Sequence, residues 1–278
     1  MIESAVRFGD GNRLIGIHCL PENAQMGRNL PAVIFLNAGL LHRVGPFRFY
    51  VDLARIFCSM GYSSFRFDLS GIGDSEANDG SEGYEKNAIK DAKAAMDFVQ
   101  AKSNISTFIL LGLCAGADNA HRIAGVDSRV VGAVFLDGYG FPTPWFKVRD
   151  YAPGLLKPHK WLKYLKKYLG GTVTPSVNTD ITVFERLWPT RETAMHELSQ
   201  LVQRGVELIF IYSGGVPVYY NYRNQFKDMF KPVDFRGKLK LEYFKHANHT
   251  YTVLEQREKL FKCICSWVSD KFGKGSHA

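Results

Sequence analysis

Apolar runs of strand length alternate along this chain with stretches of helical periodicity, and this alternation limits the fold more than any other feature. The runs are mostly continuous, as expected for strands buried on both faces of a parallel sheet. They span residues 32–36, 63–67, 107–113, 130–136, 207–212 and 239–244. The helical stretches span about 47–60, 84–102, 115–124, 191–204, 221–230 and 253–270. Together with a hairpin over residues 4–19, the pattern predicts an α/β fold whose central sheet is mostly parallel and flanked by helices.

Residues 138–190 interrupt this alternation. About 50 residues separate two predicted strands there, where a plain crossover needs far fewer, and the segment is rich in proline and aromatic residues. We therefore expect one domain over residues 1–278 with a helical cap inserted at 138–190. Within the cap, apolar residues of 158–171 recur at helical spacing opposite a face of lysines, which predicts a lid helix.

The chain is basic, with 35 Lys and Arg against 27 Asp and Glu and a net charge of +8 at neutral pH. The excess is local, because residues 138–171 hold seven of the bases and one acid. These lysines either lie in solvent outside the lid or receive an acidic acyl carrier protein, and association with a membrane surface is a third interpretation. Nucleic acid ranks last as a partner because no base-stacking or groove-binding motif accompanies the charge.

The cysteines, the apolar segments and the first residues indicate the cellular compartment of the protein. Five cysteines, an odd number without the spacing of a disulfide framework, predict reduced thiols. No apolar run approaches the ~18–20 residues that cross a bilayer, so we expect no stable membrane insertion. The first residues include acids where a signal peptide is basic and then apolar, which predicts a cytoplasmic protein. Without H-E-x-x-H or clustered Cys and His, no metal or organic cofactor is expected.

The strand predicted at 107–113 runs into Gly112-Leu113-Cys114-Ala115-Gly116, and a predicted helix follows at once. G-x-C-x-G between a strand and a helix is typical of a nucleophile elbow, a strained turn in which small neighbours let strand and helix pass closely. A thiol at Cys114 would project above the sheet edge, where the Ala115 N–H and the helix N-terminus would stabilise an oxyanion and lower the pKa of the thiol. The alternative interpretation is a buried structural cysteine.

A second motif follows the strand predicted at 63–67, where Asp68, Gly71, Gly73 and Ser75 form D-x-x-G-x-G-x-S. The glycines allow a tight loop, and Asp68 is expected to hydrogen-bond backbone groups in a structural role. The lack of a lysine at P-loop spacing argues against a phosphate-binding loop.

These two motifs, in this order after a strand ending in Asn37-Ala38-Gly39, resemble those of the α/β-hydrolase superfamily over about residues 30–270. The stretches AGLLHRVGPFRF, RFDLSGIGDS and GLCAGAD further resemble small hydrolases found with exosortase systems and related cysteine hydrolases of secondary-metabolite clusters. The resemblance implies an α/β-hydrolase fold with the nucleophile after the fifth strand of the family order, followed along the chain by an acid and a histidine.

The resemblance also points to the histidine and to the second oxyanion donor. Superfamily histidines lie in the last loop before the C-terminal helix, where His246 and His249 stand. The stretch Asn248-His249-Thr250 resembles the family pattern, which favours His249. The loop at Gly39 and Leu40 would supply the second N–H of the oxyanion hole, beside that of the residue after the nucleophile.

The acid is not at the commonest superfamily position. After the strand predicted at 207–212 the chain reads SGGVPVYYNYRNQ, which contains no carboxylate. Asp137 directly follows the strand predicted at 130–136, where some lipase-like relatives carry their acid. We therefore expect Asp137 to be the acid, and the alternatives are Asn221 as a neutral orienter, Asp228, or no third residue. A cysteine nucleophile tolerates the lack of the usual acid better than serine does, because a thiol ionises near neutral pH and needs less help from its base.

These residues predict an enzyme in which Cys114 attacks an acyl carbonyl, His249 transfers the proton and Asp137 orients His249. We expect ester or thioester acyl transfer through an S-acyl enzyme, completed by water in a hydrolase or by an amine or alcohol in an acyltransferase. The aromatic cap predicts a sizeable apolar acyl group. The alternative is a non-catalytic module that binds an acyl group or another small molecule on a hydrolase scaffold. The residues expected to contact substrate are His42, Tyr139, Trp145 and Trp161. His42 could instead only hold its own loop in place.

Overall fold

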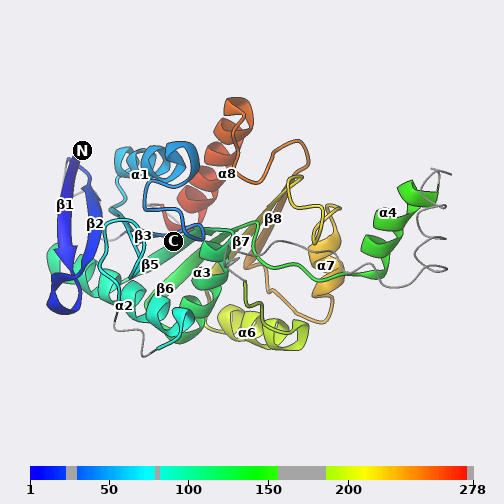
Figure 1. Cartoon of the computed structure of the whole chain (residues 1–278), viewed down its shortest axis with the longest axis horizontal. Helices are drawn as coiled ribbons and strands as arrows, with labels where there is room; N and C mark the ends of the chain where they lie inside the picture. The colour runs from blue at the N-terminus through cyan, green and yellow to red at the C-terminus, as the bar shows by residue number, and fades with distance from the viewer. Residues whose placement is uncertain (23–29, 79–81, 156–185, 274–278) are drawn as a thin grey trace, which may run out of the picture.

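The structure is a computed structural model that describes residues 1–22, 30–78, 82–155 and 186–273. Its centre is an eight-stranded sheet with the order β1-β2-β4-β3-β5-β6-β7-β8 (Figure 1). Every strand predicted from the sequence is present, within one or two residues of its expected bounds. The strands are β1 (Ile2–Phe8), β2 (Leu14–Leu20), β3 (Ala32–Leu36), β4 (Ser64–Phe67), β5 (Phe108–Leu113), β6 (Val130–Leu136), β7 (Glu207–Ser213) and β8 (Leu239–Phe244).

The sheet is mostly parallel, which confirms the sequence prediction. β1 pairs antiparallel with β2, and β2 pairs antiparallel with β4, whereas every other neighbouring pair is parallel. The turn of the first hairpin is a 3-10 helix, η1 (Asp10–Asn12). Because the strands from β4 to β8 are parallel, their carboxyl ends meet at one edge of the sheet, and the loops that follow them lie there together.

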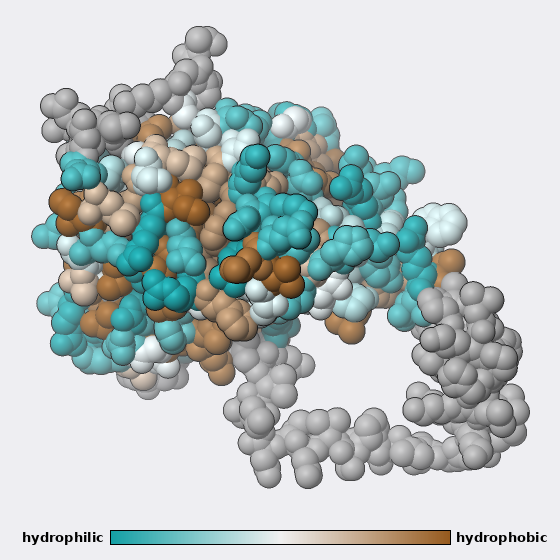
Figure 2. All heavy atoms as spheres, turned by 90° about the horizontal axis from the view of Figure 1, so that it is seen from above, coloured by the Kyte–Doolittle hydropathy of each residue, from teal (hydrophilic) through white to brown (hydrophobic). Residues whose placement is uncertain are grey.

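Helices cover both faces of the sheet (Figure 1). α1 (Phe49–Ser59), preceded by η2 (Pro46–Arg48), and α8 (Leu254–Phe272) lie on one face. The other face is covered by α2 (Tyr84–Ser103), α3 (Ala115–Val126) and α6 (Arg191–Gln203). Seen from the side of α1 and α8, the surface is mainly hydrophilic with small groups of hydrophobic side chains (Figure 2). The helices are therefore amphipathic, with their apolar sides on the sheet.

α7 (Gln225–Met229) is shorter than the helix expected over 221–230. The residues before it form a turn in which the Asn221 N–H donates to the Gln225 side chain at 2.9 Å. A side chain that satisfies a backbone donor in this way replaces a helical hydrogen bond, so the helix begins later than its apolar spacing predicts.

The core follows the two-residue period of the strands. In β3, Ala32, Ile34 and Leu36 pack in the layer of α2, α3 and α6, whereas Val33 and Phe35 pack in the layer of α1 and α8. All five side chains are buried. Burial on both faces explains why these strands read as continuous apolar runs. The two packed layers also fix the sheet edge at which the loops meet.

Cys19 and Cys58 form a disulfide, so the expectation of reduced thiols is wrong for this pair. Cys19 lies in β2 and Cys58 in α1, 39 residues apart in sequence, and their Cα atoms are 6.4 Å apart. The spacing of the cysteines could not reveal the pair, because the two residues meet only once α1 packs on the sheet. Among the described residues, Cys114, Cys263 and Cys265 are free.

The structure describes part of the segment in which we expect a cap, 138–190. This segment contains α4 (Pro144–Leu155), which the hydroxyls of Thr143 and Tyr222, 2.6 Å apart, connect to the segment after β7. The lid helix expected at 158–171, with Trp161 and most of the basic residues, lies outside the described residues. In the ranges that the structure describes, no helix is long and apolar enough to cross a membrane.

Candidate active site

Cys114 occupies the turn between β5 and α3, with a φ of 59° and a ψ of −122°. A non-glycine residue holds such a strained conformation only where its surroundings fix it. Here the flanking glycines do so: a Cβ on Gly112 would overlap the backbone of Gly116, and a Cβ on Gly116 would lie 2.7 Å from the carbonyl oxygens of Leu36 and Asn37. The end of β3, the end of β5 and the start of α3 therefore pack at backbone contact around Cys114.

Asp137 directly follows β6, is fully buried and has a positive φ of 47°. Its carboxylate accepts hydrogen bonds from Ser213 N at 2.6 Å and from Ser213 Oγ at 2.7 Å, and its Oδ2 lies 2.8 Å from His249 Nδ1. Ser213 is the last residue of β7, which neighbours β6 in the sheet. The carboxylate thus comes from β6 and is held by β7, the strand after which the sequence has no acid.

His249 lies in the loop between β8 and α8 and joins the other two side chains. It hydrogen-bonds Asp137 through Nδ1 and makes a second side-chain hydrogen bond with Cys114. Burial alone would lower the pKa of His249. The hydrogen bond with Asp137, which has the largest effect, and the hydrogen bond with Cys114 outweigh burial and raise this pKa to about 9. The imidazole is therefore protonated at neutral pH.

The surroundings of Cys114 favour its thiolate. Burial raises the pKa of the thiol, but the hydrogen bond with His249, the charge of Arg186 and the N–H of Ala115 together bring that pKa below its usual value of 9.0. A lowered thiol pKa and a raised imidazole pKa favour a thiolate–imidazolium pair. In contrast, burial raises the pKa of Cys263 and of Cys265 to about 11.

The N–H groups expected to form an oxyanion hole lie on two sides of the elbow. The Ala115 N–H, in the first turn of α3, donates to Cys114. Gly39 and Leu40 stand in the loop after β3, which lies beside the elbow because β3 pairs with β5 along its whole length. Within the part of the chain that the structure describes, the amides of Gly39 and Leu40 have no hydrogen-bond acceptor.

Asp68 holds the loop after β3 in place. Its buried carboxylate accepts hydrogen bonds from the Arg43 N–H at 2.5 Å and the Asp74 N–H at 3.2 Å, and it forms an ion pair with the Arg43 guanidinium. Gly73 packs against the carboxylate where any larger residue would overlap it. The structural role predicted for Asp68 is confirmed, and through it the loops after β3 and β4 form one unit.

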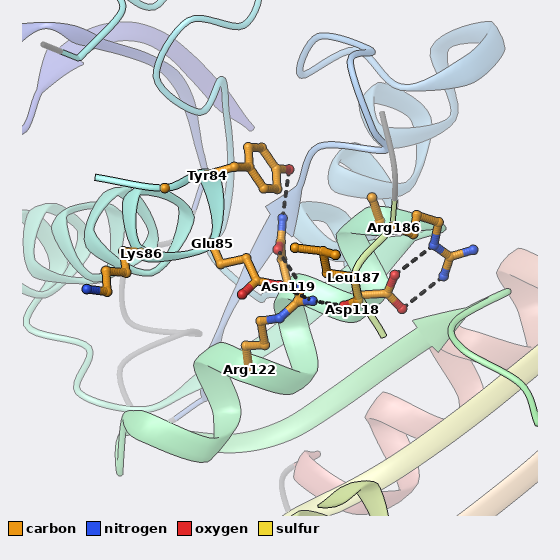
Figure 3. A pocket seen from close by; sticks show the side chains of 10 residues that line it. Tyr84, Glu85, Lys86, Asp118, Asn119, Arg122, Arg186 and Leu187 are labelled. Carbon is orange, nitrogen blue, oxygen red and sulfur yellow. Dashed lines mark hydrogen bonds and ion pairs between the residues drawn. The ribbon is translucent and has the colours of Figure 1, made fainter. Parts of the chain in front are cut away.

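A pocket of about 400 Å³ opens beside the elbow, along the side of α3 that runs from Ala115 to Arg122 (Figure 3). The start of α2 and the chain leading into α6 close it. Two ion pairs lie in its wall, Arg186 with Asp118 at 2.7 Å and Arg122 with Glu85 at 2.5 Å. A second pocket of about 220 Å³ shares Asp118 and Arg122 with it.

The residues expected to contact substrate lie in different places. Tyr139 is buried in the core and lines the smaller pocket. Trp145 lies on α4 and is 63% exposed. His42 is exposed in the loop after β3. Trp161 lies outside the described residues, and the role of all four in substrate binding stays a prediction.

The alternative acid and histidine candidates have other surroundings. His246 is exposed to solvent, Asn221 donates to a backbone carbonyl of α4, and Asp228 accepts from a tyrosine hydroxyl. Asp137 is the candidate acid that lies within hydrogen-bonding distance of His249.

Two residues of this site were missed by sequence reasoning. Ser213 donates twice to Asp137, and the Arg186 guanidinium reaches the carbonyl oxygens of both Cys114 and Asp137. Neither residue belongs to a motif. A serine at the end of a strand and an arginine in a loop are both common, so the sequence alone does not single them out. The sequence offered one signal for Ser213: the segment after β7 has no carboxylate, so another group can occupy the end of that strand.

The sheet order, the strained turn after the fifth strand and the histidine loop before the last helix define the α/β-hydrolase fold. Solved structures of this fold match nearly the whole chain. The α/β-hydrolase GrgF from Penicillium sp. sh18 has 15% identity, covers 98% of this chain and 98% of its own, and gives a TM-score of 0.59. An esterase from Pyrococcus furiosus has 15% identity, with 98% of this chain and 90% of its own covered and a TM-score of 0.61.

A third similar structure is the meta-cleavage product hydrolase of Pseudomonas fluorescens, with 13% identity, 96% of this chain and 97% of its own covered, and a TM-score of 0.60. At such low identities the likeness shows the fold, and the chemistry has to be argued from the site. No family model and no curated protein sequence matches the chain.

Proposed function

We propose that this chain is an acyl-transferring enzyme in which Cys114 is the nucleophile, His249 the proton carrier and Asp137 the acid that orients His249. The observation that supports it is the hydrogen-bonded series Cys114–His249–Asp137, assembled from the loops after β5, β8 and β6. A nucleophile within reach of a base that a third group orients is the geometry of covalent acyl transfer. Hydrolases that share the fold are in keeping with this chemistry.

In the proposed reaction the Cys114 thiolate adds to the carbonyl carbon of an ester or thioester, and the carbonyl electron pair moves onto oxygen. The N–H groups of Ala115 and of Gly39 or Leu40 hydrogen-bond this oxyanion. When the intermediate collapses, the bond to the leaving group breaks, and the His249 imidazolium donates its proton to the departing alcohol or thiol. An S-acyl enzyme remains.

The second half of the reaction removes the acyl group from Cys114. His249, now neutral, takes a proton from water or from an acceptor amine or alcohol, whose oxygen or nitrogen attacks the acyl carbon. The carbon–sulfur bond breaks, the Cys114 thiolate is restored, and His249 is again its imidazolium partner. Water yields a carboxylic acid and makes the enzyme a hydrolase, whereas an amine or alcohol makes it an acyltransferase.

The charge of the cap suggests how an acyl group would arrive. Lys147 and Arg149 are exposed on α4 and begin the basic segment. An acidic acyl carrier protein would associate faster with such a surface, and high salt would remove the advantage. Carrier docking therefore stays part of the proposal.

The competing function is a binding module without catalysis. A site that only binds an acyl group needs neither an ionised thiol nor a carboxylate aimed at a histidine. The paired Cys114 and His249 therefore favour the enzyme.

The test is acylation of the protein by a panel of activated acyl thioesters and esters, followed by mass spectrometry of the intact chain and of its peptides. We expect an acyl adduct on Cys114 of the wild type and none after Cys114→Ala. Cys263→Ala is the matched control and should keep the adduct, because the half-buried Cys263 thiol has a raised pKa. A wild type that neither acylates nor turns over any member of the panel would contradict the enzyme and favour the binding module.

A further inference from the structure

The side chain of Arg186 contacts the site from the end of the cap segment. Its Nη2 donates to the carbonyl oxygens of Cys114 and Asp137, each at 3.3 Å, and its Nη1 lies 3.4 Å from the hydroxyl of Tyr219. The Tyr219 hydroxyl itself donates to the Asp137 carbonyl at 3.1 Å. One guanidinium therefore connects the two turns that have strained backbones, the elbow after β5 and the turn after β6.

The guanidinium is held in place by Asp118, in the first turn of α3 (Figure 3). Two parallel hydrogen bonds, Nε to Oδ2 at 2.7 Å and Nη2 to Oδ1 at 2.9 Å, join Arg186 to Asp118. Trp188 and Tyr219 lie against the guanidinium at 5.0 and 5.8 Å from their ring centres. Such a bidentate, stacked and largely buried arrangement has one orientation, which a lysine could not reproduce.

We propose that Arg186 is a positioning residue of this active site: with Asp118 as its anchor, it holds the Cys114 turn against the Asp137 turn and supplies the positive charge that favours the Cys114 thiolate. The inference rests on the proposed function, because it assigns Arg186 to the same nucleophile. It goes further in making the last part of the cap segment a component of the catalytic geometry.

The charges around the elbow support this role. Asp118 is 4% exposed and lies one turn from Cys114, so its carboxylate by itself would oppose a second negative charge on the sulfur. Arg186 cancels that effect. Among the effects that lower the pKa of Cys114, the charge of Arg186 is the second largest, after the hydrogen bond with His249. All of these effects act against burial, which raises that pKa.

Arg122 is a matched control within the same pocket. It also lies on the pocket wall and is also paired with an acid, Glu85, at 2.5 Å. Its other hydrogen bonds go to Asn119 and to the Leu187 carbonyl, away from the two turns. A general effect of removing a positive charge from the pocket would appear in Arg122 variants as well.

The experiment measures the rate at which iodoacetamide alkylates Cys114 as a function of pH, followed on the Cys114 peptide by mass spectrometry. Arg186→Gln should move the midpoint of this profile up by about one pH unit, the lower end of what one nearby opposite charge contributes. Arg122→Gln should leave the midpoint where it is. Arg186→Lys should keep most of the charge effect but lower acyl turnover, because one ammonium cannot hold both turns.

Arg186→Gln leaves a buried carboxylate without its partner and is at risk of not folding. The double variant Arg186→Gln with Asp118→Asn removes both charges, and it should give a midpoint between those of the wild type and Arg186→Gln. Equal midpoints for wild type and Arg186→Gln, or equal shifts for the Arg186 and Arg122 variants, would overturn the proposal. Alkylation needs no acyl substrate, so the two proposals can fail separately. If the wild type is not acylated but its alkylation midpoint still depends on Arg186, the proposed reaction is contradicted and this inference stands.

Discussion

Asp137 illustrates how the site depends on single side chains. A fully buried carboxylate is stable as an anion only when partners replace its water, and here Ser213 supplies two hydrogen bonds and His249 a third contact. The two partners serve different purposes. His249 takes part in the proposed chemistry, whereas Ser213 holds the carboxylate in position through two hydrogen bonds. Substitutions of the two partners should therefore separate an effect on reactivity from an effect on stability.

Asp137→Asn retains the size of the side chain and removes the charge that keeps His249 protonated. We expect kcat/KM for a thioester that acylates Cys114 to fall about 100-fold, the low end of what general acid–base catalysis contributes. Steady-state kinetics would check this. Asp228→Asn, the same change at the other candidate acid, should leave kcat/KM unchanged, and an unchanged value for Asp137→Asn would exclude Asp137 as the acid.

Ser213→Ala removes one hydrogen bond to the charged carboxylate but keeps the bond from the Ser213 N–H. The free energy of unfolding should fall by about 1.5–3 kcal/mol, as for a hydrogen bond to a charged group. Urea denaturation would measure it. Turnover should fall less than in Asp137→Asn, and a larger loss of turnover than in that variant would show that Ser213 acts on the chemistry itself.

At the level of elements, the elbow depends on the close approach of β3, β5 and α3. Gly116 in α3 faces backbone oxygens at the end of β3, so any side chain there pushes the helix away from the strand that carries the loop of Gly39 and Leu40. Gly125, at the other end of the same helix, faces open space. The two glycines thus make a matched pair within one helix.

Gly116→Ala should lower the free energy of unfolding by about 1–3 kcal/mol, the usual cost of overpacking. It should also reduce acylation of Cys114, because the elbow and the oxyanion donors would separate. Gly125→Ala should instead be neutral or stabilising by about 0.5–1 kcal/mol, since alanine loses less conformational freedom in a helix. Thermal or urea unfolding of both variants checks the pair, and equal stabilities would contradict the packing described here.

At the level of the whole molecule, the Cys114–His249 pair links stability to pH through two opposing effects. The raised pKa of His249 gives stability that is complete below 6.5 and is lost as pH rises through about 9. The lowered pKa of Cys114 gives stability that is present above 9.0 and is lost as pH falls through the lowered pKa. A folded thiolate–imidazolium pair binds one proton, as does an unfolded thiol with a neutral imidazole, so the two contributions to the pH dependence oppose each other.

Cys114→Ala removes one of the two opposing effects. The variant should lose stability relative to the wild type as pH rises above 6.5, because the part of the raised His249 pKa that Asp137 causes then remains without the opposing contribution of the thiol. The measurement is urea denaturation of both proteins across this range. Since all other titrating groups are shared, the difference between the two curves isolates the pair, and a difference that does not change with pH would contradict a thiolate–imidazolium pair.

The sequence predicted the elements of the fold more completely than the contacts of the site. The strands were found because buried parallel strands are continuous apolar runs, and the elbow because its glycines and strained turn lie within five consecutive residues. The shortened α7 was not foreseen, since the side chain of Gln225 caps the turn before it. The Cys19–Cys58 disulfide was missed because it joins a strand to a helix 39 residues away.

By itself the sequence determined the α/β architecture, the position of Cys114 at the end of the fifth strand and the short set of acids and histidines that could join it. These features follow from local periodicity and turn chemistry, which neighbouring residues encode. The tertiary structure decided that Asp137 faces His249, 112 residues away, and that Ser213 and Arg186 hold the arrangement. Those contacts arise where separate loops meet at one sheet edge, and local sequence does not specify which side chains touch there.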